Sequence, residues 1–166
     1  MKIKNKEKIY CIVAILLMID QFIKLIIKNN LKLFEEIKVI PKFFSIYYLE
    51  NDGAAFSILG GRTFILIIVG IIALILFDKF ISNNDKLSNV EVISFGMVMA
   101  GIVGNLIDRC LYGSVIDYLS FNIFNYNFPV FNFADICITI GALLMLIDIM
   151  RRDLYDRSKR RRNKNR

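Results

Sequence analysis

The stretch FNFADICITIGALLMLIDIM, residues 131–150, decides the fold class of this chain. It is apolar and has the length of about 20 residues that a transmembrane helix needs. Asp135 lies near its start, three residues after Asn132, with no Lys or Arg within four positions. Asp148 lies near its end, where two arginines follow closely and a salt bridge explains the acid. Because ionisable groups inside membrane segments are costly and usually functional, Asp135 requires a functional explanation.

Three other apolar segments precede this one. Of the 166 residues, 56% are hydrophobic, which is too many for an ordinary soluble domain. A chain of this length suits one domain. We therefore predict an α-helical membrane protein with four transmembrane helices, built as a single multi-pass domain over residues 1–166. The expected spans cover about residues 9–27, 62–77, 91–107 and 131–150, followed by a basic tail over 151–166.

Basic residues concentrate at the two ends of the chain. Four of the 22 Lys and Arg lie in residues 1–8, and nine lie in residues 151–166. Because cytoplasmic loops carry an excess of Lys and Arg, we expect both termini in the cytoplasm. The segments 28–62 and 108–130 then face outside, and 78–90 forms a cytoplasmic loop. A nucleic-acid-binding arm is the competing interpretation of the C-terminal tail, and the overall pattern favours a membrane protein with no nucleic-acid partner.

Both outer segments contain strand-like sequence. IKVIPKFFSIYYLE, residues 37–50, and FNIFNYNFPVF, residues 121–131, are rich in β-branched and aromatic residues. This composition is typical of short strands. Aromatic rings also favour the boundary between membrane and water, so we expect these segments at the outer membrane surface.

Polar residues gather toward the outer ends of all four predicted spans. Asp20 and Lys24 are four residues apart, so they share a helix face and can form an ion pair. Asn132 and Asp135, three residues apart, also share a face. Because polar groups in membrane helices normally face the bundle interior, this convergence predicts a functional site at the outer face. The candidate residues are Asp20, Gln21, Lys24, Asn51, Asp52, Asn105, Asp108, Arg109, Asp117, Asn132 and Asp135.

Structural roles are an alternative explanation for several of these residues. Asp20–Lys24 and Asp108–Arg109 could be ion pairs that brace the ends of helices, and Asp108 could also lie in water at the interface. Asn132 could cap the last helix, since Asn is a favoured N-cap residue. The spacing alone does not decide between these roles and a role in catalysis.

Asp117 and Asp135 are the two acids that structural roles explain least. Asp117 lies in the apolar, strand-like run SVIDYLSF, with no basic residue close to it in sequence. Two neighbouring carboxyls share one proton, so one can act as a general base on water and the other as a general acid on a carbonyl oxygen. The chain has no histidine, and its three cysteines show no C-x-x-C spacing, so we expect no metal and no cofactor. These residues support hydrolysis by an aspartate dyad.

Two other functions would use the same acids. A small four-span transporter or proton-relay protein would pass protons along Asp20, Asp117 and Asp135, although relays usually distribute their acids across the membrane depth. A lipid-binding or assembly factor would use the acids structurally, and Asp117→Asn would then leave its function intact. The gathering of the acids at one face favours chemistry at the interface.

Five blocks carry a resemblance to a known family: DQFIK (20–24), NDGAAF (51–56), GIVGNLIDR (101–109), SVIDY (114–118) and FPVFNFAD (128–135). In this order they resemble the signature blocks of bacterial lipoprotein signal peptidases, the signal peptidase II family of membrane aspartyl endopeptidases. The resemblance implies removal of signal peptides from diacylglyceryl-modified prolipoproteins, with the cut just before the lipidated cysteine. It also implies an active site toward the extracytoplasmic face of the bacterial cytoplasmic membrane, with membrane lipids as further partners. Nothing in the sequence requires more than a monomer.

The resemblance further implies roles for individual positions. Asp117 and Asp135 would form the catalytic pair. An extracytoplasmic β-cradle would fall within residues 36–50, and a flap over the site would lie around residues 54–61. The substrate-binding or supporting residues would be Asp20, Lys24, Asn51, Gly53, Ala54, Asn105, Asp108, Arg109 and Asn132.

Overall fold

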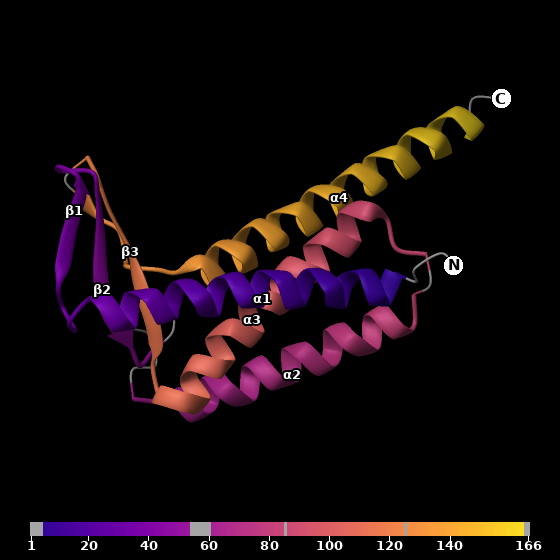
Figure 1. Ribbon diagram of the computed structural model, residues 1–166. Coiled ribbons are helices and arrows are strands. Elements are labelled where there is room, and N and C mark those ends of the chain that lie inside the picture. The colour runs from indigo at the N-terminus through magenta and orange to yellow at the C-terminus, as the bar shows by residue number, and fades with distance from the viewer. Residues whose placement is uncertain (1–4, 54–60, 85, 125, 165–166) are drawn as a thin grey trace.

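The computed structural model describes residues 5–53, 61–84, 86–124 and 126–164. Within these residues, four helices lie together and a small antiparallel sheet lies at one end of them (Figure 1). Each helix is long and apolar enough to cross a membrane, the last one over Phe133–Tyr155. The predicted fold class is therefore confirmed. The helices are α1 (Asn5–Asn30), α2 (Thr63–Ser82), α3 (Asn89–Tyr112) and α4 (Phe133–Lys164).

Each helix continues beyond the apolar stretch that predicted it, at one end or at both. α2 runs on to Ser82, so the loop predicted over 78–90 is shorter than expected. α3 begins just after Ser88 because Ser88 and Glu91 form a capping box, in which each side chain accepts from the other's backbone N–H. The basic tail continues α4 as helix to Lys164, which agrees with the good helix propensity of Lys and Arg. Hydropathy marks the part of a helix that lies in lipid, whereas backbone hydrogen bonding continues past it.

α3 is the central helix. In its apolar window 56% of the residues are buried, against 6% to 17% in the other three helices. Its glycines allow close neighbours: a Cβ on Gly104 would lie 2.5 Å from Asp20 Oδ2 of α1, and one on Gly101 would clash with the carbonyl oxygen of Ala134 in α4. Small residues on α3 therefore let α1 and α4 approach it closely. Away from the sheet, the helices pack around the core residues Ile9, Ile81, Val92, Phe95 and Met99.

The sheet contains β1 (Glu36–Ile40), β2 (Phe44–Asn51), β3 (Val115–Ile123) and β4 (Tyr126–Asn127), in that spatial order. All neighbouring strands are antiparallel. Phe131, which comes just before α4, adds a bridge to Leu119 of β3. The strand-like sequence predicted within 37–50 thus forms β1 and β2, and the second outer segment forms β3 and β4.

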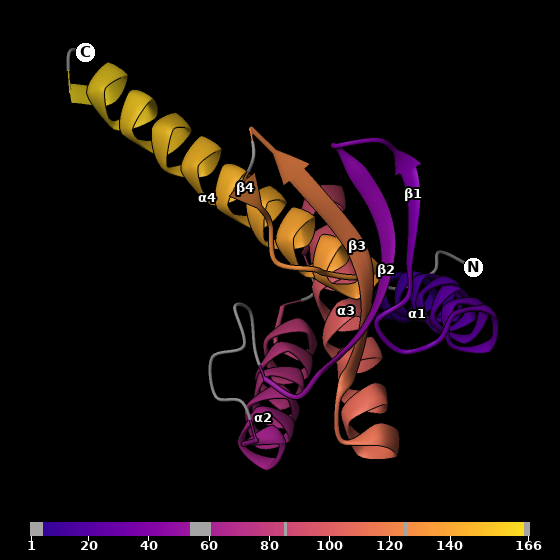
Figure 2. The same ribbon diagram turned by 90° about the vertical axis from the view of Figure 1, so that its left-hand side faces the viewer.

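The sheet lies across the end of the helices where α1 and α3 finish and α4 begins (Figures 1 and 2). α1 begins and α4 ends at the opposite end (Figure 1). Gly113 adopts a left-handed conformation, which lets α3 turn directly into β3. A second core joins α1 to β2 and β3, and consists of Ile27, Leu31, Tyr48, Ile116 and Tyr118. Five elements therefore meet at the end of the bundle where the sequence predicted the functional site, namely α1, α3, α4, β2 and β3.

Candidate active site

Asp117 lies in β3 with only 2% of its surface exposed. Its carboxyl accepts hydrogen bonds from Asn51 Nδ2 at 2.9 Å and from Asn132 Nδ2 at 2.7 Å. Burial, followed by the negative charge of Asp135, raises the pKa of Asp117 to about 7, although the two amide contacts oppose the rise. Asp117 is thus able to gain and lose a proton near neutral pH, as a general acid or base requires.

Asp135 is the third residue of α4, and it forms a capping box with Asn132. The backbone N–H of Asn132 donates to Asp135 Oδ2 at 3.1 Å, and the backbone N–H of Asp135 donates to Asn132 Oδ1 at 3.0 Å. The other carboxyl oxygen, Oδ1, accepts from Asn105 Nδ2 at 2.8 Å. The capping geometry therefore fixes the direction in which the Asp135 carboxyl points.

Asn132 is the residue that links the two acids. Its backbone N–H and side-chain oxygen bind Asp135, while its side-chain NH₂ donates to Asp117 Oδ1 and to Asn105 Oδ1. It is fully buried. Asn132 is thus the N-cap of α4, as its structural interpretation suggested. It is also a member of the polar site, as the convergence of polar residues predicted.

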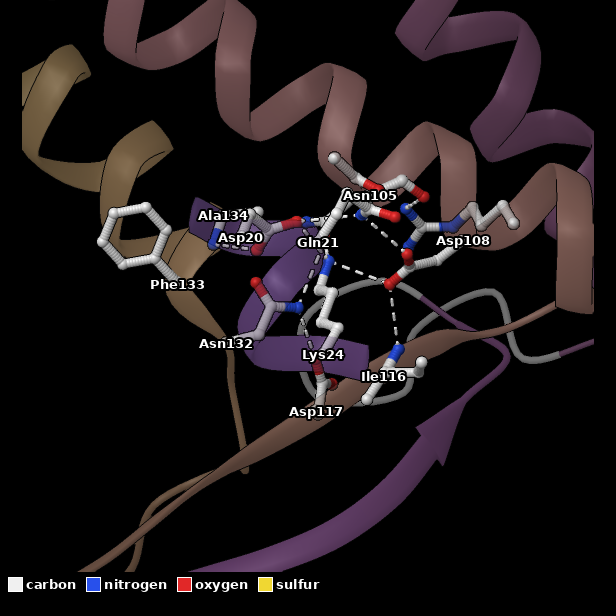
Figure 3. A network of polar contacts seen from close by, with 12 residues as sticks. Asp20, Gln21, Lys24, Asn105, Asp108, Ile116, Asp117, Asn132, Phe133 and Ala134 are labelled. Carbon is white, nitrogen blue, oxygen red and sulfur yellow. Dashed lines mark hydrogen bonds and ion pairs between the residues drawn. The ribbon is translucent and has the colours of Figure 1, made fainter. Parts of the chain in front are cut away.

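A buried ion cluster lies next to this pair (Figure 3). Lys24 Nζ lies 2.9 Å from Asp20 Oδ2 and 2.8 Å from Asp108 Oδ2, and it donates to Asn105 Oδ1 at 3.1 Å. The ion pair predicted between Asp20 and Lys24 is confirmed. The suggestion that Asp108 lies in water is wrong, because it is 1% exposed and faces α1.

The cluster also ties the surrounding elements together. Asp20 Oδ1 accepts from the backbone N–H of Ala134 at the start of α4, at 3.0 Å. Asp108 Oδ2 accepts from the backbone N–H of Ile116 in β3, at 3.2 Å. Gln21 Nε2 donates to Asp20, to Asp108 and to the carbonyl oxygen of residue 104. The cluster therefore holds the strand of Asp117 and the helix of Asp135 against α1 and α3.

Arg109 points away from its neighbour Asp108. Consecutive helical residues point about 100° apart, since a turn holds 3.6 residues. Arg109 Nη2 donates to the carbonyl oxygen of Gly53 at 2.8 Å, and no salt bridge among the described residues joins Arg109 to Asp108, which pairs with Lys24. The suggested Asp108–Arg109 pair is therefore wrong. Asn51 Oδ1 accepts from the backbone N–H of Gly53, so the site reaches the end of β2.

Two predicted features fall outside the described residues. These are Ala54 and all of the flap around 54–61 except Gly61. The structure therefore leaves both as predictions. The other predicted site residues all lie at the end of the bundle next to the sheet.

Sequence reasoning missed several partners of the site. Tyr118 Oη accepts from the backbone N–H of Phe133 at 3.2 Å, which supports the start of α4. Its position directly after Asp117 is a signal that could have found it. The backbone donors of Ile116 and Ala134 leave no such signal, because every residue except proline carries a backbone N–H.

An open cavity of about 380 Å³ lies beside Asp135. Apolar side chains supply most of its wall, so it suits an apolar chain. The other lining residues are Phe128, Phe131, Ile136, Thr139 and Ile140.

The fold and the site define a class: a multi-pass membrane protein with two carboxyls, the buried Asp117 and the half-buried Asp135, joined by Asn132 at one end of its helices. A family model described as Signal peptidase (SPase) II matches residues 12–151. The chain belongs to the signal peptidase II family, and this membership indicates a protease. The resemblance found in the sequence is thereby confirmed.

Relatives and solved structures agree with this placement. A lipoprotein signal peptidase of Staphylococcus haemolyticus is 38% identical over 152 residues, which cover 91% of this chain and 96% of the relative. A lipoprotein signal peptidase of Halothermothrix orenii is 37% identical over 139 residues, which cover 84% of this chain and 92% of the relative. A bacterial membrane enzyme structure determined by the in meso method at 2.3 Å matches with a TM-score of 0.81 and 36% identity, covering 86% of this chain and 87% of that one. Another bacterial membrane enzyme structure, at 1.9 Å, matches with a TM-score of 0.77 and 36% identity, covering 85% of this chain and 91% of that one.

Proposed function

We propose that this protein removes the signal peptide from diacylglyceryl-modified prolipoproteins by cutting just before the lipidated cysteine. The name of its relatives, lipoprotein signal peptidase, supports the substrate class. The observation that carries the mechanism is the contact of one residue, Asn132, with the carboxyls of both Asp117 and Asp135. The protein thereby acts as an aspartic endopeptidase.

The two carboxyls act on one water molecule and one peptide bond. Asp117 holds the shared proton, because burial and the charge of Asp135 raise its pKa. Asp135 takes a proton from water as the water oxygen attacks the scissile carbonyl carbon, and Asp117 gives its proton to the carbonyl oxygen. As the C–N bond breaks, the proton on Asp135 passes to the leaving nitrogen, and one hydroxyl of the tetrahedral intermediate returns its proton to Asp117 as the new carboxyl group forms.

The surroundings of the pair fit an apolar substrate that reaches the site from the membrane. The cavity beside Asp135 is lined mainly by apolar side chains and suits the signal peptide or the lipid of the substrate. The basic ends of the chain favour a cytoplasmic location for both termini, which supports a position of the sheet and the dyad at the extracytoplasmic boundary of the cytoplasmic membrane.

The test uses the purified full-length protein in detergent micelles or bilayers with a diacylglyceryl-modified prolipoprotein. Cleavage before the lipidated cysteine is expected with the wild-type protein. Asp117→Asn and Asp135→Asn should each reduce turnover by at least about 10²–10⁴-fold, the usual contribution of general acid–base catalysis. Asp148→Asn is the matched control, because Asp148 lies at the other end of α4 and pairs with Arg152. Full activity of either dyad variant contradicts the mechanism.

Further measurements separate this function from cleavage of other substrates, from metal-dependent hydrolysis and from transport. A prolipoprotein without the diacylglyceryl group should remain uncut, which tests the substrate class. A metal chelator should leave cleavage unchanged, and metal-dependent cleavage would refute the aspartate mechanism. A transporter that uses the same acids would show proton flux into vesicles and no cleavage.

A further inference from the structure

Lys24 is buried among partners that use all three of its ammonium hydrogens. Its side chain is 2% exposed, and Nζ contacts Asp20 and Asp108 as ion pairs and Asn105 Oδ1 as a hydrogen bond. An ammonium group donates and never accepts. The group that faces Lys24 from Asn105 must therefore be the amide oxygen and not the amide NH₂.

This requirement fixes the orientation of a second amide as well. With its oxygen toward Lys24, Asn105 directs its NH₂ to Asp135 Oδ1 at 2.8 Å. The same oxygen accepts from Asn132 Nδ2 at 3.1 Å, so the Asn132 NH₂ lies on the side that reaches Asp117 Oδ1 at 2.7 Å. The Asn132 oxygen is left to cap the backbone N–H of Asp135. Every contact in this series runs from a donor to an acceptor, and Lys24 is its first donor; Figure 3 shows Lys24, Asn105, Asn132 and Asp117.

We propose that Lys24 is a positioning residue for the reaction: it sets the direction of the Asn105 and Asn132 amides, so that each carboxyl of the dyad receives an N–H. The proposal rests on the proposed function, because it assigns a role toward the Asp117–Asp135 pair. Without Lys24, rotation of the Asn105 amide would place its oxygen against the Asp135 carboxyl, where two acceptors repel each other. The dyad would then lose the fixed geometry that catalysis requires.

A role in stability alone explains the arrangement less well. Buried ion pairs contribute little net stability, because the desolvation of both charges offsets their attraction. Lys24 also contacts Asn105, which is neutral and which lies directly against Asp135. Any carbonyl oxygen could satisfy the third ammonium hydrogen, and the acceptor present is the amide whose NH₂ contacts Asp135.

The first test is Lys24→Met, measured as kcat, KM and the pH profile of prolipoprotein cleavage. Loss of the orienting donor should lower kcat by about 10²-fold at unchanged KM, the size expected for misplaced catalytic groups. Loss of a positive charge should also shift the pH profile toward higher pH, since a nearby cation favours ionised carboxyls. A purely structural role would leave the kcat of the folded variant at the wild-type value.

Several charged groups surround Lys24 and take part in such a shift. Asp20 faces it from α1, and Asp108 faces it from α3. The dyad acids face it through Asn105 and Asn132 from β3 and α4, and the charge of Lys24 acts on Asp117 directly. Among the described residues, Lys28 lines the same pocket as Lys24 and Asp108, and Arg109 interacts electrostatically with Asp108, Asp117 and Asp135.

Lys24→Met leaves two buried carboxylates without their cation, so this variant can fail to fold. Lys24→Met combined with Asp20→Asn removes one positive and one negative charge and keeps the net charge of the cluster. Asp108 retains its bonds from Ile116 N and Gln21 Nε2, and the new asparagine retains an oxygen for the backbone N–H of residue 134. Compared with Asp20→Asn alone, the double variant should show a kcat lower by about 10²-fold at a similar melting temperature.

Lys28→Met is the matched control. Lys28 lies one turn further along α1 and contacts the ring of Tyr112, with Nζ 3.3 Å from the ring centroid. Its loss should leave both kcat and the pH profile at wild-type values. A folded double variant with the kcat of Asp20→Asn overturns the proposal, as does a folded Lys24→Met with the kcat of the wild type. Failure of the proposed function appears differently, as a wild-type protein that does not cleave the lipidated substrate.

Discussion

Asp117→Asn should abolish hydrolysis and also stabilise the folded protein at neutral and alkaline pH. The pKa of Asp117 rises from 3.8 to about 7 on folding, because of burial and the charge of Asp135. At about 1.4 kcal/mol per pKa unit, ionising this group in the fold costs roughly 4 kcal/mol. Asparagine has one acceptor oxygen, so one donor of Asn51 or Asn132 meets an NH₂, at a cost of about 1–3 kcal/mol. The net gain above pH 7 should therefore be about 1–3 kcal/mol.

The same cause predicts the pH dependence of stability. Because the folded pKa of Asp117 lies above the unfolded one, the stabilisation from this group is complete below pH 3.8 and is lost as pH rises to about 7. Between pH 5 and pH 8 the free energy of unfolding of the wild-type protein should fall by about 3 kcal/mol, a loss that Asp117→Asn does not share. The reason is that pH 5 lies two pH units below the folded pKa of about 7.

The measurement is chemical unfolding in detergent micelles at pH 5 and pH 8 for the wild type, Asp117→Asn and the control Asp148→Asn. For each protein, the free energy of unfolding at pH 8 is subtracted from that at pH 5. Carboxyls that titrate alike in all three proteins contribute equally to these differences, so their contributions cancel when the proteins are compared. The control should follow the wild type, because Asp148 pairs with Arg152 far from the dyad. An equal pH dependence in Asp117→Asn and the wild type would refute the assignment of a raised pKa to Asp117.

Three further outcomes follow from single contacts. The rate of cleavage should fall as pH rises through about 7, because Asp117 then loses the proton that it gives to the carbonyl oxygen; a rate that stays constant to pH 9 would argue against this role. Gly104→Ala places a Cβ 2.5 Å from Asp20 Oδ2 and should destabilise the protein by about 1–3 kcal/mol, whereas Gly70→Ala meets side chains only at 3.6 Å and beyond and should change the melting temperature little. Ser88→Ala removes the N-cap of α3 and should cost about 1 kcal/mol of stability with cleavage retained, and a loss of cleavage without unfolding would contradict a purely local role.

Patterns in the sequence were sufficient for the helices, because hydrophobic length is a local property. The ends of the helices were not predictable in the same way. The apolar stretch ends at residue 77, whereas α2 runs to Ser82, because residues 78–82 remain hydrogen-bonded as helix beyond it. The start of α3 could have been found, because Ser88 and Glu91 have the spacing of a capping box.

The site was predictable as a set of residues, and less so as a set of contacts. The spacing of Asp20 and Lys24 predicted their pair, since both lie on one helix. Asp108 could not be assigned from sequence, because its partner Lys24 lies 84 positions away on another helix. Packing of glycines on α3 brings the two together, and the register of that packing is a property of the whole fold.

The position of the buried cation explains how the dyad keeps its proton. A cation in direct contact with Asp117 would favour the ionised carboxyl and lower its pKa, which would remove the general acid. Lys24 is instead paired with Asp20 and Asp108 and contacts the dyad through the amide of Asn105, so its charge lowers the pKa of Asp117 less than burial and Asp135 raise it. Arg109, the other cation near the site, directs a guanidinium nitrogen to the carbonyl oxygen of residue 53. Amide groups therefore orient both carboxyls without adding a formal charge next to them, which leaves burial and the charge of Asp135 to hold the proton on Asp117.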